Sequence, residues 1–119
     1  MSSFKLFDAE YKFACIIWEL EPIPSPELVK VCLDRLGWKK STTYTVLKKL
    51  CDRGILQNKS TIVSALVKRE QVQKYESDEL LDRAFDGSLP TFLATFLHDR
   101  KLSKDEAEKL SKMIMEASE

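Results

Sequence analysis

The residues from Gly37 to Gly54 read GWKKSTTYTVLKKLCDRG, one short amphipathic pattern with a glycine at each end. Val46, Leu47 and Leu50 recur at steps of three and four residues, which is typical of the buried stripe of a helix. Serine is a preferred N-cap residue and glycine a preferred helix stop. The stretch therefore predicts a helix over 41–53, capped by Ser41. The side chains expected on or beside its outward face are polar or basic: Thr42, Tyr44, Thr45, Lys48 and Lys49.

Two more helices are predicted before this one. The first spans about 9–20 with Asp8 as its cap, and the second begins at Ser25-Pro26, where serine caps and proline takes the first helical position. Gly37 ends the second helix, so only about three residues separate it from the helix described above. Two helices joined by so short a turn, the second of them basic on its exposed face, are typical of a helix-turn-helix.

Two β-branched or aliphatic runs follow, Ile55–Gln57 and Thr61–Val67, and the polar residues 58–60 separate them. A connection this short is typical of a β-hairpin. A hairpin directly after a helix-turn-helix is a wing. We therefore predict a winged helix over 1–67, in a chain that is mainly α with a small β-hairpin wing.

From about Lys68 the pattern returns to helix, with segments that end at Gly87, cover Pro90–Leu97 and begin at a Ser103–Glu106 capping box. Three helices make a unit too small to bury their own apolar side chains. We therefore expect a three-helix dimerisation domain over 68–119, in which a second copy covers Leu80, Leu81, Phe85, Leu89, Phe92, Leu93, Phe96, Leu97, Leu110 and Ile114. The alternative is that these helices fold back onto the winged helix as one core.

The composition lacks the chemistry of most enzymes: the 119 residues include three glycines and one histidine. No phosphate-binding glycine loop, catalytic motif or metal-ligand spacing occurs, so we predict no enzyme activity, no cofactor and no metal. An enzyme would need an unrecognised site around His98 or Cys15. The three cysteines are expected to be reduced core thiols, which predicts a cytoplasmic location. No apolar run approaches the ~20 residues that span a bilayer.

The net charge is zero, but its distribution along the chain is uneven. Residues 1–38 balance to −2 (four basic, six acidic), residues 39–59 to +5 (six basic, one acidic) and residues 60–119 to −3 (nine basic, twelve acidic). A basic segment that coincides with an exposed helix predicts contact with a polyanion.

Double-stranded DNA is the polyanion that this layout fits best. Short polar side chains at the start of a recognition helix reach base edges in the major groove, and lysines around it reach phosphates. We predict these DNA-binding residues: Lys39, Lys40, Ser41, Thr42, Tyr44, Thr45, Lys48, Lys49 and Lys59. Ser41 has the alternative role of a cap only, and Tyr44 that of a packing residue. The alternative function is a winged-helix protein–protein interaction module that docks an acidic partner.

The chain resembles the penicillinase repressor family of winged-helix transcriptional repressors. The clearest match is 37–56, with the family's tryptophan, threonine-rich recognition helix and glycine-terminated exit into the wing. Glu10 and 16–18 fit the first helix, and 85–89 and 102–106 are similar to the dimerisation region. The resemblance implies a homodimer that binds a palindromic operator and blocks transcription, with base and phosphate contacts at Ser41, Thr42, Tyr44, Thr45 and Lys49.

The resemblance also implies ways of inducing the repressor. Antibiotic-responsive members are cut by a sensor-linked protease at an Asn-Phe bond in the fourth helix, which implies such a protease as a partner. The matching place in this sequence is Glu79-Leu80, a departure from that bond. Copper-responsive members carry a C-terminal cysteine-rich metal site, whereas here no cysteine follows Cys51, so copper sensing by that route is excluded. The wing is shorter and less basic than is usual in the family.

Overall fold

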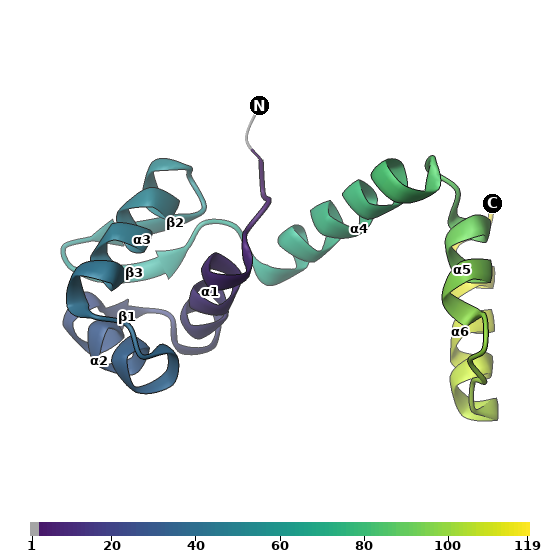
Figure 1. The fold of residues 1–119 in the computed structure, drawn as a ribbon, viewed down its shortest axis with the longest axis horizontal. Helices are drawn as coiled ribbons and strands as arrows, with labels where there is room; N and C mark the ends of the chain where they lie inside the picture. The colour runs from purple at the N-terminus through teal and green to yellow at the C-terminus, as the bar shows by residue number, and fades with distance from the viewer. Residues whose placement is uncertain (1–2) are drawn as a thin grey trace. The chain divides into compact units, whose positions relative to one another are not determined.

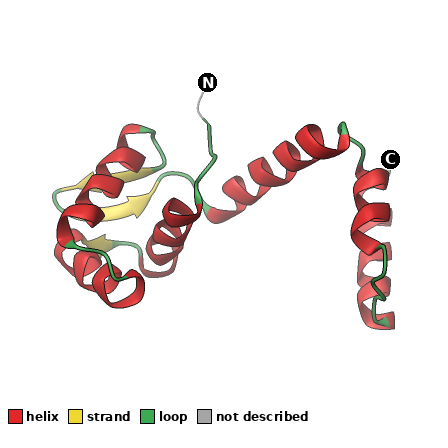
Figure 2. Cartoon of the chain, in the orientation of Figure 1, coloured by secondary structure: helices red, strands yellow, loops and turns green. Residues whose placement is uncertain are grey.

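The computed structural model describes residues 3–119, and these form helices joined by short loops with one small sheet (Figures 1 and 2). The strands are antiparallel and lie in the order β1-β3-β2. The predicted fold class, mainly α with a small hairpin wing, is confirmed. In chain order the elements are α1 (Asp8–Leu20), β1 (Ile23–Pro24), α2 (Ser25–Leu36), α3 (Lys40–Asp52), β2 (Leu56–Lys59), β3 (Ile62–Ala65), α4 (Arg69–Phe85), α5 (Leu89–Leu97) and α6 (Lys104–Ala117).

The chain divides into two compact units, and the division falls within α4. The first unit ends at Glu79 and the second covers the rest of the chain. The first turns of α4 belong to the first unit because Val72 is fully buried and the Tyr75 ring meets the Phe4 ring edge to face at 6.1 Å. The functional division predicted at 67/68 does not coincide with this packing boundary, and it stays a prediction.

One apolar core holds the first unit together. Phe13 and Ile17 of α1, Leu28 of α2, Leu50 of α3 and Val63 of β3 are each 0% exposed. Because elements from both ends of this unit share the same buried side chains, the core sets the position of α3 relative to α1, α2 and the hairpin.

Three of the predicted helix caps are wrong. Asp8 and Ser25 are the first residues of α1 and α2, and Ser41 lies inside α3; none of the three helices has a side-chain cap of the expected kind. At α1 the Glu10 carboxylate accepts a hydrogen bond from the backbone N–H of Phe7 instead. Ser25 is buried, and its hydroxyl accepts a hydrogen bond from the Tyr44 hydroxyl instead of capping the helix. The predicted start of the last helix is confirmed: Ser103 Oγ accepts from the backbone N–H of Glu106.

The turn between β2 and β3 consists of Ser60 and Thr61, and Lys59 pairs with Ile62 across it. The φ angles of the two turn residues are 52° and 67°. Two positive φ angles are what a type I′ turn requires, and its twist matches that of a hairpin. The Thr61 carbonyl accepts from the backbone N–H of Ser25 at 2.7 Å, which ties the turn to the start of α2.

The strand β1 was not predicted. Its two residues pair with β3, Ile23 with Val63 and Pro24 with Ile62, and complete the three-stranded sheet. Two residues between prolines are too few to show the alternation by which a strand is detected.

The second unit has no interior of its own. No residue from Leu80 to Glu119 is buried, and all of them are described. Its order comes from local contacts: the Gly87 N–H donates to the Leu81 carbonyl at 2.8 Å where α4 ends, and the Phe85 and Phe92 rings meet edge to face at 5.3 Å. A unit of this kind leaves its apolar side chains available to a partner.

The strained turn gives a stability prediction. The double substitution S60N/T61G is expected to stabilise the first unit by about 0.5–1 kcal/mol, because asparagine and glycine adopt positive φ at lower cost than serine and threonine. Urea unfolding followed by circular dichroism measures the change. Ser60→Pro, which fixes φ near −65°, is expected to act in the opposite direction. Destabilisation by the double substitution would contradict the assigned turn.

Candidate nucleic-acid interface

The helices α2 and α3 are joined as a helix-turn-helix. Gly37 ends α2 in the left-handed region with φ 68°, and its N–H donates to the Leu33 carbonyl at 3.1 Å. After this turn α3 begins at Lys40. The Trp38 ring in the turn stacks on the Phe13 ring of α1, with centroids 5.5 Å apart and an interplanar angle of 22°. The start of α3 is therefore held against the core by an aromatic pair.

The two faces of α3 differ sharply in exposure. Thr43 is 0% exposed and Leu47 2% exposed, so one side of the helix is fully buried. Ser41, Thr42 and Thr45 are exposed on the other side, and for Thr42 and Thr45 the helical spacing predicted this. The face that α3 offers to a partner thus begins with three hydroxyl groups.

The start of α3 favours anions. The first backbone N–H groups of a helix have no acceptor within it, and they form the positive end of the helix dipole. In α3 the first helical hydrogen bond runs from the Thr43 N–H to the Lys39 carbonyl, so the N–H groups before Thr43 point out of the helix end. Lys39 and Lys40 are exposed at the same place. Backbone and side chains together suit a phosphate there.

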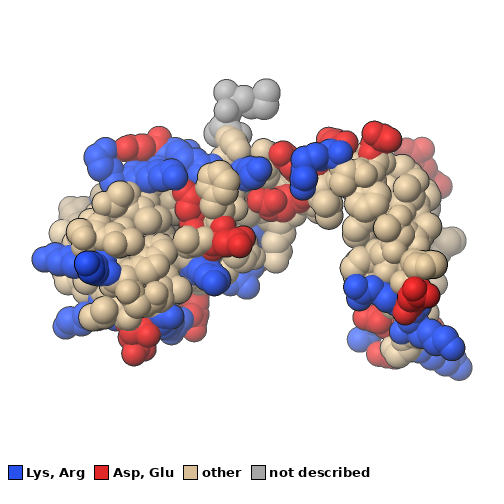
Figure 3. All heavy atoms as spheres, in the orientation of Figure 1, with Lys and Arg blue, Asp and Glu red and all other residues tan. Residues whose placement is uncertain are grey.

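The six basic residues between 39 and 59 differ in how far a carboxylate neutralises them. Lys48 Nζ lies 2.8 Å from Asp52 Oδ2, and both side chains are exposed. Lys49 Nζ lies 3.0 Å from Glu10 Oε2, and Arg53 Nη1 lies 3.7 Å from Glu10 Oε1. Within residues 3–119 no carboxylate forms an ion pair with the remaining three, Lys39, Lys40 and Lys59. Figure 3 shows basic side chains over the first unit, with acidic ones between them.

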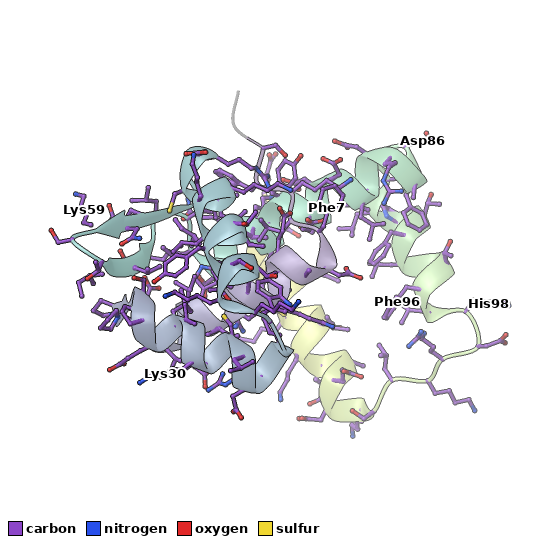
Figure 4. All side chains as sticks on the ribbon, turned by 60° about the vertical axis from the view of Figure 1, so that its left-hand side comes forward. Phe7, Lys30, Lys59, Asp86, Phe96 and His98 are labelled. Carbon is purple, nitrogen blue, oxygen red and sulfur yellow. The ribbon has the colours of Figure 1, made fainter. Side chains whose placement is uncertain are left out.

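The hairpin carries one of these three lysines. Lys59 is the last residue of β2, and Figure 4 shows its side chain at the tip of the hairpin, pointing away from the sheet. Because the turn is hydrogen-bonded to the start of α2, the tip is a fixed feature of the first unit. Lys59 therefore offers a charge at a defined place beside α3.

Glu10 was not predicted as part of this site. Its carboxylate is 6% exposed, accepts from the Phe7 N–H at 2.9 Å and faces both Lys49 and Arg53. Burial raises the pKa of Glu10, but the Phe7 hydrogen bond and the charges of Lys49 and Arg53 outweigh burial, so its pKa is lowered. No local pattern marks this role, because Glu10 and its cationic partners are far apart in the sequence.

A family model described as "Penicillinase repressor" matches residues 6–116. The chain belongs to the penicillinase repressor family. A relative named penicillinase repressor, from Bacillus licheniformis, is 23% identical over 116 residues, which is 94% of this chain and 91% of the relative. The family resemblance predicted from the sequence is thereby confirmed. Membership in a repressor family supports a role in transcription regulation rather than catalysis.

In this member of the penicillinase repressor family, the Tyr44 side chain packs against α2 and is only partly exposed to solvent. The side chain is half-buried, and its hydroxyl donates a long hydrogen bond of 3.4 Å to Ser25 Oγ. The ring also borders a crevice of about 210 Å³ between α3 and the hairpin, which Leu47 and Asn58 line as well. These contacts favour the packing alternative, and a DNA contact by Tyr44 stays a prediction.

The cysteines and the histidine are not among the predicted DNA-binding residues. Burial raises the pKa of the Cys32 and Cys51 thiols, so both are protonated at neutral pH. His98 is exposed, with Nε2 3.4 Å from Asp99 Oδ2. Over the described range 3–119, no cluster of three or more potential metal ligands occurs. No helix there is long and apolar enough to cross a membrane.

The buried carboxylate predicts a pH-dependent stability. Because the pKa of Glu10 in the fold lies below its ordinary value of 4.5, its ionised form stabilises the fold at pH above 4.5. That contribution is lost as the pH falls through the lowered pKa. Glu10→Gln is expected to reduce the free energy of unfolding by about 1–2 kcal/mol at pH 7, and the difference from wild type should narrow at pH 3. Urea titrations at both pH values measure it.

Glu19→Gln is the matched control, since its partner Arg35 and Glu19 itself are both exposed. It should leave stability nearly unchanged at both pH values. An equal effect of the two substitutions would contradict the special role of Glu10.

Proposed function

We propose that this protein is a transcriptional repressor that binds double-stranded DNA as a homodimer, with α3 of each copy in the major groove at one half of a palindromic operator. The exposed face of α3 carries this proposal: three hydroxyl side chains lie at the helix start, beside two lysines without an ion-pair partner among the described residues. Membership in the family supports the repressor role.

The chemistry of that face suits DNA. Hydroxyl groups both donate to and accept from base edges, and the methyl groups of Thr42 and Thr45 can contact the methyl of thymine. The helix start and the ammonium groups of Lys39 and Lys40 would take phosphates on one side of the groove. Lys59 would reach the backbone on the wing side.

Lys48 and Lys49 would contribute unequally. Asp52, the partner of Lys48, is exposed, so a phosphate can replace it at little cost. Glu10, the partner of Lys49, is buried and cannot move into water. Lys49 would therefore contact DNA only while it still neutralises Glu10.

The second unit supports dimerisation. An apolar groove of about 500 Å³ lies between α5 and α6, and its lining includes six of the residues predicted for the dimer interface: Phe92, Leu93, Phe96, Leu97, Leu110 and Ile114. Nothing in residues 80–119 is buried within one chain, so a second copy would supply the missing interior. Two-fold symmetry would then require two half-sites, about 34–36 Å apart or a multiple of that.

Induction by a sensor-linked protease also remains a proposal. The bond between Glu79 and Leu80 lies inside α4 at the boundary between the two units. Leu80 is 37% exposed, but a protease would have to unwind the helix locally to reach the bond. Cleavage there would separate the two units.

Substitutions on α3 test the DNA contact. Lys40→Ala is expected to weaken binding to every duplex and to lower the slope of log K against log salt by about 1, because one phosphate contact is lost. Thr45→Ala is expected to change the preference among sequences and to leave the slope unchanged. Fluorescence anisotropy with a duplex from the protein's own upstream region, over a range of salt concentrations, measures both.

Lys74→Ala is the control, because Lys74 pairs with Asp78 on α4. It should leave affinity and slope unchanged. If the wild type binds no duplex and instead binds an acidic protein partner, the alternative interaction module is correct and the repressor proposal is wrong.

A charge in the groove tests dimerisation. Phe96→Asp is expected to give a monomer, because a carboxylate within an apolar interface has no partner. Sedimentation velocity measures the mass, and far-ultraviolet circular dichroism checks that the helices remain. Lys109→Asp, on the polar face of α6 near Asp105, should stay dimeric. A monomeric wild type would contradict the proposed dimer.

A further inference from the structure

The segment before α1 is fixed against the C-terminal end of α3. Arg53, which follows α3, donates from Nη2 to the carbonyl oxygens of Ser3 at 3.0 Å and Lys5 at 2.6 Å. Leu6 is 8% exposed and belongs to the core. Residues 3–7 form neither helix nor strand, but these contacts hold the segment at the C-terminal end of α3.

Phe7 is the exposed aromatic residue of this segment, with 63% of its surface accessible. The centroid of the Phe7 ring (Figure 4) lies 5.9 Å from Lys5 Nζ and 5.9 Å from Lys49 Nζ, and both distances are within the range of cation–π attraction. The ring thus holds a lysine of the N-terminal segment and a lysine of α3 at one place. Lys49 lies on the exposed face of α3, so this patch adjoins that face.

The patch has an excess of positive charge. Lys49 and Arg53 pair with one buried carboxylate, that of Glu10, and Lys5 lies over the same Phe7 ring as Lys49, which leaves a balance of +2 (three less one). No carboxylate in the described part of the chain pairs with Lys5. The neighbouring acid Asp8 lies on the other side of α1, in a crevice that Lys12 and Glu76 also line.

We propose that Lys5, Phe7 and Lys49 form a second contact with the DNA backbone, beside the major groove that α3 enters. Lys5 binds a phosphate, Lys49 contributes its charge while it neutralises Glu10, and the Phe7 ring packs against the sugar. This inference rests on the proposed function. Continuity with the exposed face of α3 and the positive charge favour the DNA backbone as the occupant. The contact is independent of base sequence because it involves phosphate and sugar alone.

The test compares two exposed lysines that are close in sequence. Lys5→Ala is expected to weaken binding about 3–10-fold on the upstream duplex and on an unrelated duplex alike, and to lower the salt slope by about 1. Lys12→Ala, which removes the same charge on the other side of α1, should change neither quantity. Lys5→Arg should restore wild-type binding. Anisotropy titrations provide the data, and urea unfolding shows whether each variant is as stable as wild type.

Phe7→Ala provides a second variant that keeps both lysines. It is expected to weaken binding to both duplexes because the ring no longer positions the ammonium groups. Wild-type binding with an unchanged slope in Lys5→Ala, or an equal loss in Lys12→Ala, overturns this contact and leaves the repressor proposal intact. A wild type that binds no duplex overturns both.

Discussion

The burial of one side of α3 is the constraint on which the first unit depends. Thr43, Leu47 and Leu50 can reach the core only if the opposite side of the helix is left in solvent. The Trp38–Phe13 stack fixes where that helix starts, and the hairpin and α2 are built against the same core. The packing that stabilises the first unit therefore also decides that Ser41, Thr42 and Thr45 are exposed.

A buried carboxylate, that of Glu10, neutralises part of the positive charge beside the exposed face of α3. Glu10 holds Lys49 and Arg53 close to α1, and Arg53 in turn holds the N-terminal segment. Among the described residues, no carboxylate forms an ion pair with the lysines at the start of α3 and on the wing. Counting the basic residues between 39 and 59 therefore overstates the net positive charge near the C-terminal end of α3. The same count omits Lys5, which the fold places over the Phe7 ring together with Lys49.

The second unit forms helices although none of its residues is buried. Local signals suffice for its helices: Ser88 caps α5, Ser103 caps α6 and Gly87 ends α4. Local signals cannot bury the groove between α5 and α6, because nine and fourteen residues offer too little surface to cover each other. The apolar side chains that line this groove are therefore left partly or fully exposed in a single chain.

Periodicity and turn chemistry were enough to predict the helices, the hairpin and the outward face of α3, because these follow from residues three or four apart. The cap at Ser25 failed because that residue is buried, so a tertiary contact replaces local capping. Asp8 and Ser41 are exposed and lie within their helices, which begin at Asp8 and at Lys40. The third strand and the roles of Glu10 and Arg53 could not be predicted, since each requires a partner distant in the chain. The residue pattern thus determined the helices and the hairpin. The shared core decided the third strand and which charges meet, because only packing brings side chains that are distant in the sequence within a few ångströms of each other.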